Sequence, residues 1–166
     1  MERVATYIKD GSADLGLTYD IYPDADIEHE VITRLAPFVL MSAKNPLAKK
    51  KKLSLKDLAN EPLILMNSPG FSEYFITYFG MYGLKPRVLH QPTTYEMVRG
   101  LLSAGNGYSF SLVKIKNTQS YDGSALVNIE LVEPPPQVNL VVASLQGYRR
   151  GRLATAFVDE CKGRLR

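Results

Sequence analysis

The chain has 166 residues, of which 45% are hydrophobic and 22% charged, and its formal net charge is +3 at pH 7. This balance excludes a disordered chain, because enough apolar surface is available to offset the entropy that is lost on folding. No apolar run reaches the roughly 18–20 residues that cross a bilayer, so we expect no association with a membrane. The single cysteine, Cys161, excludes an internal disulfide and favours a reducing compartment. Since the opening Met1-Glu2-Arg3-Val4 does not form a secretory signal, we expect a cytoplasmic protein.

The most basic stretch is the run of lysines at residues 49–52. A nucleic-acid patch is one interpretation, but no aromatic residue interrupts the run, and short blocks of like charge usually stay hydrated. We therefore interpret this stretch as a solvated loop. We also expect that the chain by itself does not bind DNA specifically.

Helical and strand patterns alternate along the chain, which is typical of parallel βαβ construction. Residues 2–10 are predicted to form a helix that ends at Gly11, since glycine tolerates the left-handed conformation at a helix end. Residues 13–19 follow as a strand of alternating polarity. Residues 33–41 form a second extended run, which is broken at Pro37.

Beyond the lysine run, Ser54 and Asp57 predict a short capped helix. Residues 62–66 form an apolar strand without alternation, which indicates burial on both faces. The next helix has the clearest pattern, a continuous aromatic stripe that we interpret as core. The stripe consists of Phe71, Tyr74, Phe75, Tyr78, Phe79 and Tyr82. Gly83 ends this helix, and a strand follows at residues 87–89.

Thr93 and Glu96 fit the pattern of a capping box and predict the start of another helix. Its buried face is expected to consist of Met97, Val98, Leu101 and Leu102. Residues 108–112 then form a strand, and two more strands are predicted at 126–132 and 138–144. The last helix is amphipathic, and its apolar stripe is expected to consist of Leu153, Phe157, Cys161 and Leu165.

The sequence contains none of the usual catalytic patterns. His29 and His90 lie far apart and outside any metal-binding motif, and no Gly-x-Ser-x-Gly nucleophile motif is present. Gly105-Asn106-Gly107 ends a predicted helix, whereas a dinucleotide-binding motif would open one. For Cys161, burial on the last helix is a simpler interpretation than a nucleophile. We therefore expect a binding protein rather than an enzyme, with no metal and no cofactor.

Several motifs follow one another in a fixed order. They are Gly11-x-x-Asp14-Leu15-Gly16-Leu17, Asn45-Pro46-Leu47-Ala48, the run from Leu53 to Ile64, Gly83-Leu84-Lys85-Pro86, and the run from Glu96 to Ser109. Together, over residues 2 to about 163, the sequence resembles the effector-binding domain of LysR-type transcriptional regulators. It departs from that family at Asn45, which replaces the usual histidine, and at Ser111-Leu112, which lacks a common proline.

The resemblance implies an α/β fold of the type 2 periplasmic-binding-protein class, with two Rossmann-like lobes and a cleft between them. Residues 1–60 and 134–166 would form lobe I, and residues 61–133 would form lobe II. The winged helix-turn-helix and the first elements of lobe I, with which such regulators begin, are absent from this sequence, so lobe I would be incomplete at its N-terminus. The resemblance further implies a small-molecule effector and DNA binding only through the absent winged-helix domain.

In open α/β sheets, ligands bind beyond the carboxyl ends of strands, where helix N-termini favour anions. This rule selects the same segments that line the inter-lobe cleft in the family. The candidate ligand-binding residues are Thr18, Tyr19, Asp20, Asn67, Ser68, Phe71, Ser72, Thr93, Thr94, Tyr95, Phe110 and Ser111. Helix capping explains Ser68 and Thr93 equally well without any ligand.

These observations predict an effector-sensing domain that binds a small polar or anionic metabolite in order to control transcription. Two alternatives stay open. One is an extracytoplasmic solute-binding receptor of the same fold, and the other is an enzyme built on this fold.

The strand at residues 13–19 leads to a separate expectation. Without the absent strands of lobe I it becomes a sheet edge, and it contains no proline or lysine that would protect it from pairing with another chain. We therefore expect a homo-oligomer that associates through this edge, or marginal stability with lobe I poorly ordered while lobe II stays compact. Thr18→Pro should weaken the association by removing a backbone donor.

Overall fold

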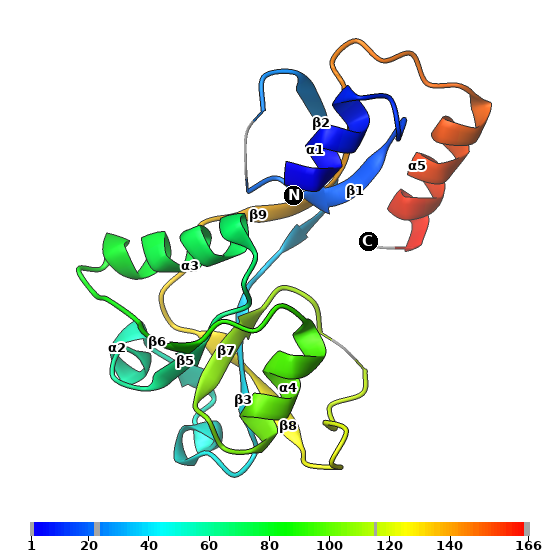
Figure 1. The fold of residues 1–166 in the computed structure, drawn as a ribbon. Helices are drawn as coiled ribbons and strands as arrows, with labels where there is room; N and C mark the ends of the chain where they lie inside the picture. Colours follow the sequence, from blue (N-terminus) through cyan, green and yellow to red (C-terminus); the bar gives the residue numbers. More distant parts are fainter. Residues whose placement is uncertain (1, 22–23, 115, 165–166) are drawn as a thin grey trace. The chain divides into compact units, whose positions relative to one another are not determined.

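The computed structural model describes residues 2–21, 24–114 and 116–164, and it divides the chain into two compact units (Figure 1). Unit 1 consists of residues 1–35 and 137–166, and unit 2 consists of residues 36–136. The chain therefore passes between the units twice, once between Leu35 and Ala36 and once between Pro136 and Gln137.

Unit 1 contains an antiparallel sheet with the strand order β1-β9-β2. The strands are β1 (Gly16–Tyr19), β2 (Ile27–Leu35) and β9 (Val138–Leu145). The central strand β9 comes from the C-terminal part of the chain and pairs on both sides with N-terminal strands. β1 is an edge strand of this sheet among the described residues, as expected, although it begins only at Gly16.

Two helices, α1 (Glu2–Lys9) and α5 (Arg152–Arg164), complete unit 1. Ile8 of α1 packs against Ile27 and Ala143 of the sheet. The backbone of Gly16 lies directly under α1, since a Cβ atom at this position would be only 2.3 Å from Cγ1 of Val4. The close approach of helix and strand therefore requires glycine at this point of the motif.

The prediction for the last helix is partly wrong. Cys161 is buried, as expected, but Leu153 and Phe157 are 89% and 45% exposed, and Leu165 lies outside the described residues. The residue that joins Cys161 in the core is Val158, and both pack against Ile32 and Val142 of the sheet. The side of the helix that faces the sheet therefore differs from the predicted one. Packing against the sheet, and not the number of apolar residues on a side, decides which side is buried.

Unit 2 contains a mixed sheet of six strands in the order β4-β8-β3-β7-β5-β6. The strands are β3 (Phe38–Ser42), β4 (Lys52–Leu53), β5 (Pro62–Ile64), β6 (Arg87–His90), β7 (Tyr108–Ser111) and β8 (Leu126–Leu131). The predicted parallel construction is found for β5 with β6 and β7, and for β4 with β8. It is wrong for β3, which is antiparallel to both β7 and β8, and for the described strands of unit 1, which pair antiparallel throughout. β3 is the strand by which the chain enters unit 2, so no βαβ crossover sets its direction.

The units divide at a different place from the predicted boundary after residue 60. Strands β3 and β4 pair with β7 and β8, and residues 36–60 therefore belong to unit 2 rather than to the lobe that contains α1 and β9. Backbone pairing between distant segments makes this assignment, and no composition change in the sequence marks it.

The segment after β3 holds a 3₁₀ helix, η1 (Pro46–Lys49), and the short helix α2 (Leu55–Leu58). The capping box predicted from Ser54 and Asp57 is confirmed, with both reciprocal hydrogen bonds present. Asp57 also accepts a hydrogen bond from Lys50 at 2.7 Å, which contributes most to lowering the pKa of this carboxyl group. The lysine run is thus partly paired rather than wholly solvated.

Helices α3 (Pro69–Met81) and α4 (Tyr95–Ser103) follow β5 and β6. The predicted aromatic stripe of α3 is confirmed as core for Phe71, Phe75, Tyr78 and Phe79, whereas Tyr82 is 41% exposed. On α4, Val98 and Leu102 are buried as predicted, but Met97 is 53% exposed.

Candidate functional site

In unit 2, three segments that were predicted to bind a ligand lie side by side. The segment after β5 is joined to the segment after β6 by two backbone hydrogen bonds, from Leu65 N to His90 O at 3.0 Å and from Asn67 N to Pro92 O at 2.7 Å. The start of α4 is joined to the end of β7, because the hydroxyl of Tyr95 donates to Oγ of Ser111 at 3.1 Å. Unit 2 therefore brings the α3 N-terminus, the α4 N-terminus and the end of β7 together.

The N-terminus of α3 offers a hydroxyl that is not used for capping. Ser68 is the N-cap residue, but its side chain makes no capping hydrogen bond. Ser72, one turn later, is buried, and its hydroxyl donates to the carbonyl of Met66 at 3.0 Å. Because the first N–H groups of a helix favour a negative charge, an uncommitted hydroxyl at this end suits an anionic or strongly polar ligand.

The capping box predicted for α4 from Thr93 and Glu96 is wrong. The N-cap residue is Thr94, which accepts from Met97 N at 3.3 Å, and not Thr93 with Glu96. The helix begins one residue later than predicted, since the carbonyl of Pro92 accepts from Asn67 N and Thr94 is still extended. Thr93 is exposed and takes no part in the cap.

At the end of β7, Ser111 is at the centre of a small network. Its buried hydroxyl accepts from Tyr95, donates to the carbonyl of Val113 at 3.1 Å, and accepts from Val113 N at 3.4 Å. These bonds fix the turn that follows the strand. The turn lies where the sequence lacks the proline that is common in LysR-type effector-binding domains.

Two of the candidate residues in unit 2 have their side chains in the core. Phe110 stacks on Phe75 with ring centroids 4.2 Å apart and planes at 3°, and it also contacts Phe79 and Tyr108 edge-on. Phe71 is 7% exposed and packs edge-on against Phe75. The rings of both residues are therefore committed to internal packing.

Of the three candidates in unit 1, Thr18 and Tyr19 end β1 and Asp20 follows it directly. Thr18 and Tyr19 pair with Val141 and Leu140 of β9, and burial raises the pKa of the Tyr19 phenol above its usual value. Both carboxylate oxygens of Asp20 accept hydrogen bonds from Asn139, at 2.7 Å from its backbone N and at 2.6 Å from Nδ2. Asp20 thus anchors the start of β9, which is a structural task that the sequence did not predict.

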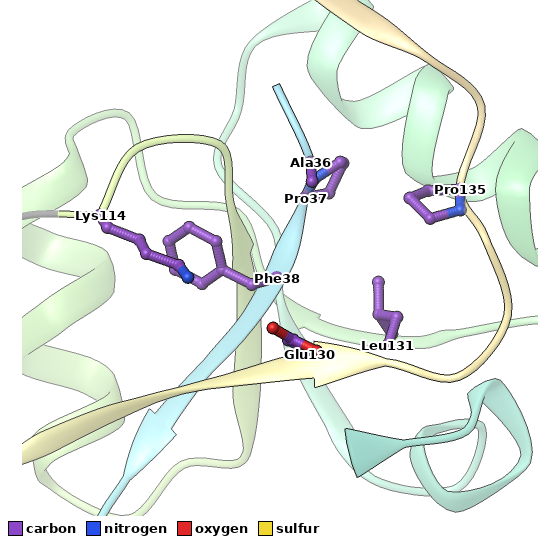
Figure 2. Close-up of a pocket in the computed structure, with 7 residues that line it drawn as sticks. All are labelled: Ala36, Pro37, Phe38, Lys114, Glu130, Leu131 and Pro135. Carbon is purple, nitrogen blue, oxygen red and sulfur yellow. The ribbon is translucent and has the colours of Figure 1, made fainter. Parts of the chain in front are cut away.

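The sequence interpretation missed two further features of unit 2. The hydroxyls of Tyr74 and Tyr78 donate to the carbonyls of Pro136 and Glu133, the latter at 2.6 Å, so the aromatic stripe also holds the proline-rich segment after β8. The second feature is a pocket of about 320 Å³ near Phe38 (Figure 2). Its lining residues come from four separate segments, and no motif connects them in the sequence.

No helix within the described part of the chain is long and apolar enough to cross a membrane. Over residues 2–21, 24–114 and 116–164, histidine, cysteine, aspartate and glutamate side chains form no group of three or more that could hold a metal ion.

A family model described as "LysR substrate binding domain" matches residues 1–166. The HTH-type transcriptional regulator AlsR of Bacillus subtilis (strain 168) is 27% identical over 103 residues, which cover 60% of this chain and 34% of AlsR. The HTH-type transcriptional regulator BenM of Acinetobacter baylyi is 26% identical over 141 residues, which cover 82% of this chain and 45% of BenM. The chain therefore spans less than half the length of these two relatives.

Solved structures show the same similarity. HinK, a LysR family transcriptional regulator from Pseudomonas aeruginosa, superposes with a TM-score of 0.91 and 30% identity, covering 99% of this chain and 57% of HinK. The BenM effector binding domain with its effector benzoate superposes with a TM-score of 0.78 over 99% of this chain and 74% of that domain. At 20% identity, the second likeness concerns the fold alone.

Proposed function

Because the chain belongs to the LysR substrate-binding domain family, we propose that it is the effector-sensing part of a transcriptional regulator. The sequence resemblance and the predicted type 2 periplasmic-binding-protein-like α/β fold are both confirmed. The match of the family model over residues 1–166 is the main support for this function. The two curated relatives are named transcriptional regulators, which favours this function over a solute receptor or an enzyme and is consistent with a cytoplasmic location.

The proposed ligand is a small polar or anionic metabolite. Three features of this chain support this ligand class. The Ser68 hydroxyl at the α3 N-terminus makes no capping bond, and Thr93 in the neighbouring segment is exposed. The Tyr95 and Ser111 hydroxyls are hydrogen-bonded to each other beside them. The BenM domain, which has this fold, binds benzoate, an aromatic carboxylate. Within unit 2, we therefore favour Asn67, Ser68, Thr93 and Tyr95 as ligand contacts. Thr18 and Tyr19 stay candidates from unit 1, and the side chains of Phe71 and Phe110 are better explained by the core.

A thermal-shift screen of small carboxylates and hydroxy acids on the 166-residue chain tests this proposal. A true effector at about 100 times its dissociation constant should stabilise the fold by about 2.7 kcal/mol. Ser68→Ala should reduce this response while leaving the stability of the free protein nearly unchanged, because Ser68 makes no capping bond. Thr94→Ala is unsuitable for this purpose, since it should cost about 1 kcal/mol by removing the α4 cap.

Ser103→Ala provides a control away from the α3 N-terminus, because the hydroxyl of this half-buried serine bonds to the carbonyl of Gly100 and to Asp122. A ligand response that Ser68→Ala and Ser103→Ala leave equally intact would contradict the assignment of Ser68. A screen in which no carboxylate or hydroxy acid gives a saturable shift would contradict the proposed ligand class.

We also propose that specific DNA binding resides outside the 166 residues. Lys50 and Lys52, which belong to the most basic stretch, are paired with Asp57 and Glu130. Any binding of DNA by this chain alone should therefore be weak and should fall steeply with added salt. Nanomolar, sequence-selective binding at physiological salt would contradict this.

Self-association of the 166-residue chain is proposed through β1, an edge strand in which Leu17 is 43% exposed. Thr18→Pro is not a suitable test, because it would break a hydrogen bond inside the sheet. Asp20 N donates to β9, and in an antiparallel ladder every second N–H points the same way, so Thr18 N also points to β9. Leu17→Lys places a charge on the edge without removing a ladder bond. Sedimentation should show a smaller species for Leu17→Lys than for the wild type, and a monomeric wild type would refute the proposal.

A further inference from the structure

A pocket in unit 2 is lined by none of the twelve candidate ligand-binding residues, although Ser111 pairs with Phe38 in its wall. It encloses about 320 Å³, which is within the usual size of small-molecule sites. Figure 2 shows that its walls come from the start of β3, the turn after β7, the end of β8 and the proline-rich segment that follows. The segments that join unit 2 to unit 1 at either end, through Pro37 and Pro135, each supply a wall.

The walls combine rigid apolar surface with one cation. Pro37, Leu131 and Pro135 supply apolar surface, and Phe38 supplies an aromatic ring that is 3% exposed. The ammonium group of Lys114 lies 5.8 Å from the centre of this ring, in cation–π range. Two prolines and a buried phenylalanine have little conformational freedom, so binding against them costs little ordering entropy.

The charges around the pocket are not balanced locally. Glu130 lines the pocket, but its carboxylate is paired with Lys52 at 3.2 Å. Within the described part of the chain, no carboxylate pairs with Lys114. The unpaired ammonium group therefore gives the pocket a preference for an anion.

Hydrogen bonds hold the backbone just before Lys114. The hydroxyl of Ser111 bonds both the N–H and the carbonyl of Val113, which holds the turn immediately before Lys114. In addition, the buried Arg99 donates to the carbonyls of Asn117 and Gln119, which holds the same loop farther along. These bonds hold the backbone at Val113, which precedes Lys114, and at Asn117 and Gln119 farther along the chain.

We propose that this pocket is a second small-molecule site, which takes a monocarboxylate with a compact apolar body. The carboxylate pairs with Lys114, and the apolar body packs between Pro37, Leu131 and Pro135. A dianion is disfavoured because Glu130 lies at the same pocket. The proposal does not depend on the effector site, since the pocket shares none of the twelve residues.

The test is a methyl NMR titration of the 166-residue chain with cyclohexanecarboxylate, observed at the Leu131 methyl groups. Cyclohexanecarboxamide and cyclohexylamine, which have the same ring, serve as neutral and cationic probes. We expect saturable Leu131 shifts with the carboxylate and at least about fivefold weaker binding of the other two, because only the carboxylate forms a charge-assisted bond with Lys114. Absence of saturable Leu131 shifts with the carboxylate, or equal affinity for all three probes, would overturn the proposal.

Two substitutions with opposite expected signs complete the test. Lys114→Gln should weaken carboxylate binding about fivefold, whereas Glu130→Gln should strengthen it by removing a negative charge. Lys116→Gln is the matched control, since it removes a nearby exposed lysine that does not line the pocket. If Lys116→Gln weakens binding as much as Lys114→Gln, the attraction is only to the general positive charge, and the assigned site is wrong. Ser68→Ala should leave binding here unchanged, which separates this result from the effector test.

Discussion

Unit 1 and unit 2 are built from the same kinds of elements, but they are stabilised in different ways. In the described part of the chain, the largest fully buried side chains all lie in unit 2, and they include Tyr78, Tyr108, Phe75, Phe79 and Phe110. The buried strand residues of unit 1 are smaller, such as Val141, Val142 and Ala143. Aromatic side chains bury the largest areas, so unit 2 gains more from the hydrophobic effect.

Unit 1 depends more on hydrogen bonds and ion pairs at its surface. Lys9 joins α1 to Asp24 and Asp26 at 2.8 and 3.0 Å, and Glu30 of β2 pairs with Arg150 and Lys162. Pairs of this kind, which are open to water and screened by salt, contribute little to stability. Because unit 1 buries less apolar surface, we expect it to open locally more often than unit 2. Amide exchange should then be faster in β1 and β2 than in β3 and β7.

The largest expected effect is in the core of unit 2. Phe75→Ala should lower the free energy of unfolding by about 3–5 kcal/mol, because it leaves a cavity beside the stacked ring of Phe110. The same change at Phe157 in unit 1 should cost only about 0.5 kcal/mol, because this ring is 45% exposed. Urea denaturation followed by tyrosine fluorescence measures both. Similar losses for the two variants would break the comparison between the units.

A smaller effect is expected at the anchor of unit 1. Asp20→Ala should cost about 1.5–3 kcal/mol, because Asn139 loses a charged acceptor for both of its N–H donors. Asp26→Ala, which removes an exposed carboxylate while Lys9 keeps Asp24, should cost less than about 1 kcal/mol. Amide exchange should accelerate in β1 and β9 with Asp20→Ala, and β7 should stay protected. If stability is unchanged, Asp20 is free for ligand binding instead.

The smallest effect is a pH dependence at Glu30. Hydrogen bonds from Lys162 and Arg150 lower the pKa of this carboxyl group in the folded state. A lowered pKa means that the stabilisation is fully present above the pKa of the unfolded chain and is lost as pH falls through the folded value. Glu30→Gln should therefore be less stable than the wild type by at most about 1 kcal/mol at pH 7. The difference should vanish in acid, and a difference independent of pH would contradict the role of the ion pairs.

Much of the local structure could be predicted from short spacings. The i, i+3, i+4 aromatic pattern of α3 and the Ser54–Asp57 capping box both involve residues within one or two turns, and both are found as expected. The ordered set of short motifs between Gly11 and Ser109 likewise identified the family. Sequence spacing encodes such features well because the interacting groups are neighbours along the chain.

Other features depend on partners that are distant in sequence. The segments that predict a ligand site in unit 2 do come together, but only the fold shows that Phe110 lies in the core and that Thr94 caps α4. Asp20 could be chosen as a ligand contact because its partner Asn139 is 119 residues away. No local pattern could reveal that the carboxylate is already used.

The sequence by itself determined the family, the α/β class and the approximate positions of most helices and strands. Only the tertiary structure decided that β3 belongs to unit 2, that Val158 and not Leu153 joins Cys161 in the core, and that Lys114 faces Phe38. The physical reason is the same in each case. Local propensity and periodicity act over a few residues, whereas strand pairing, the buried face of a helix and a pocket depend on which distant surfaces meet.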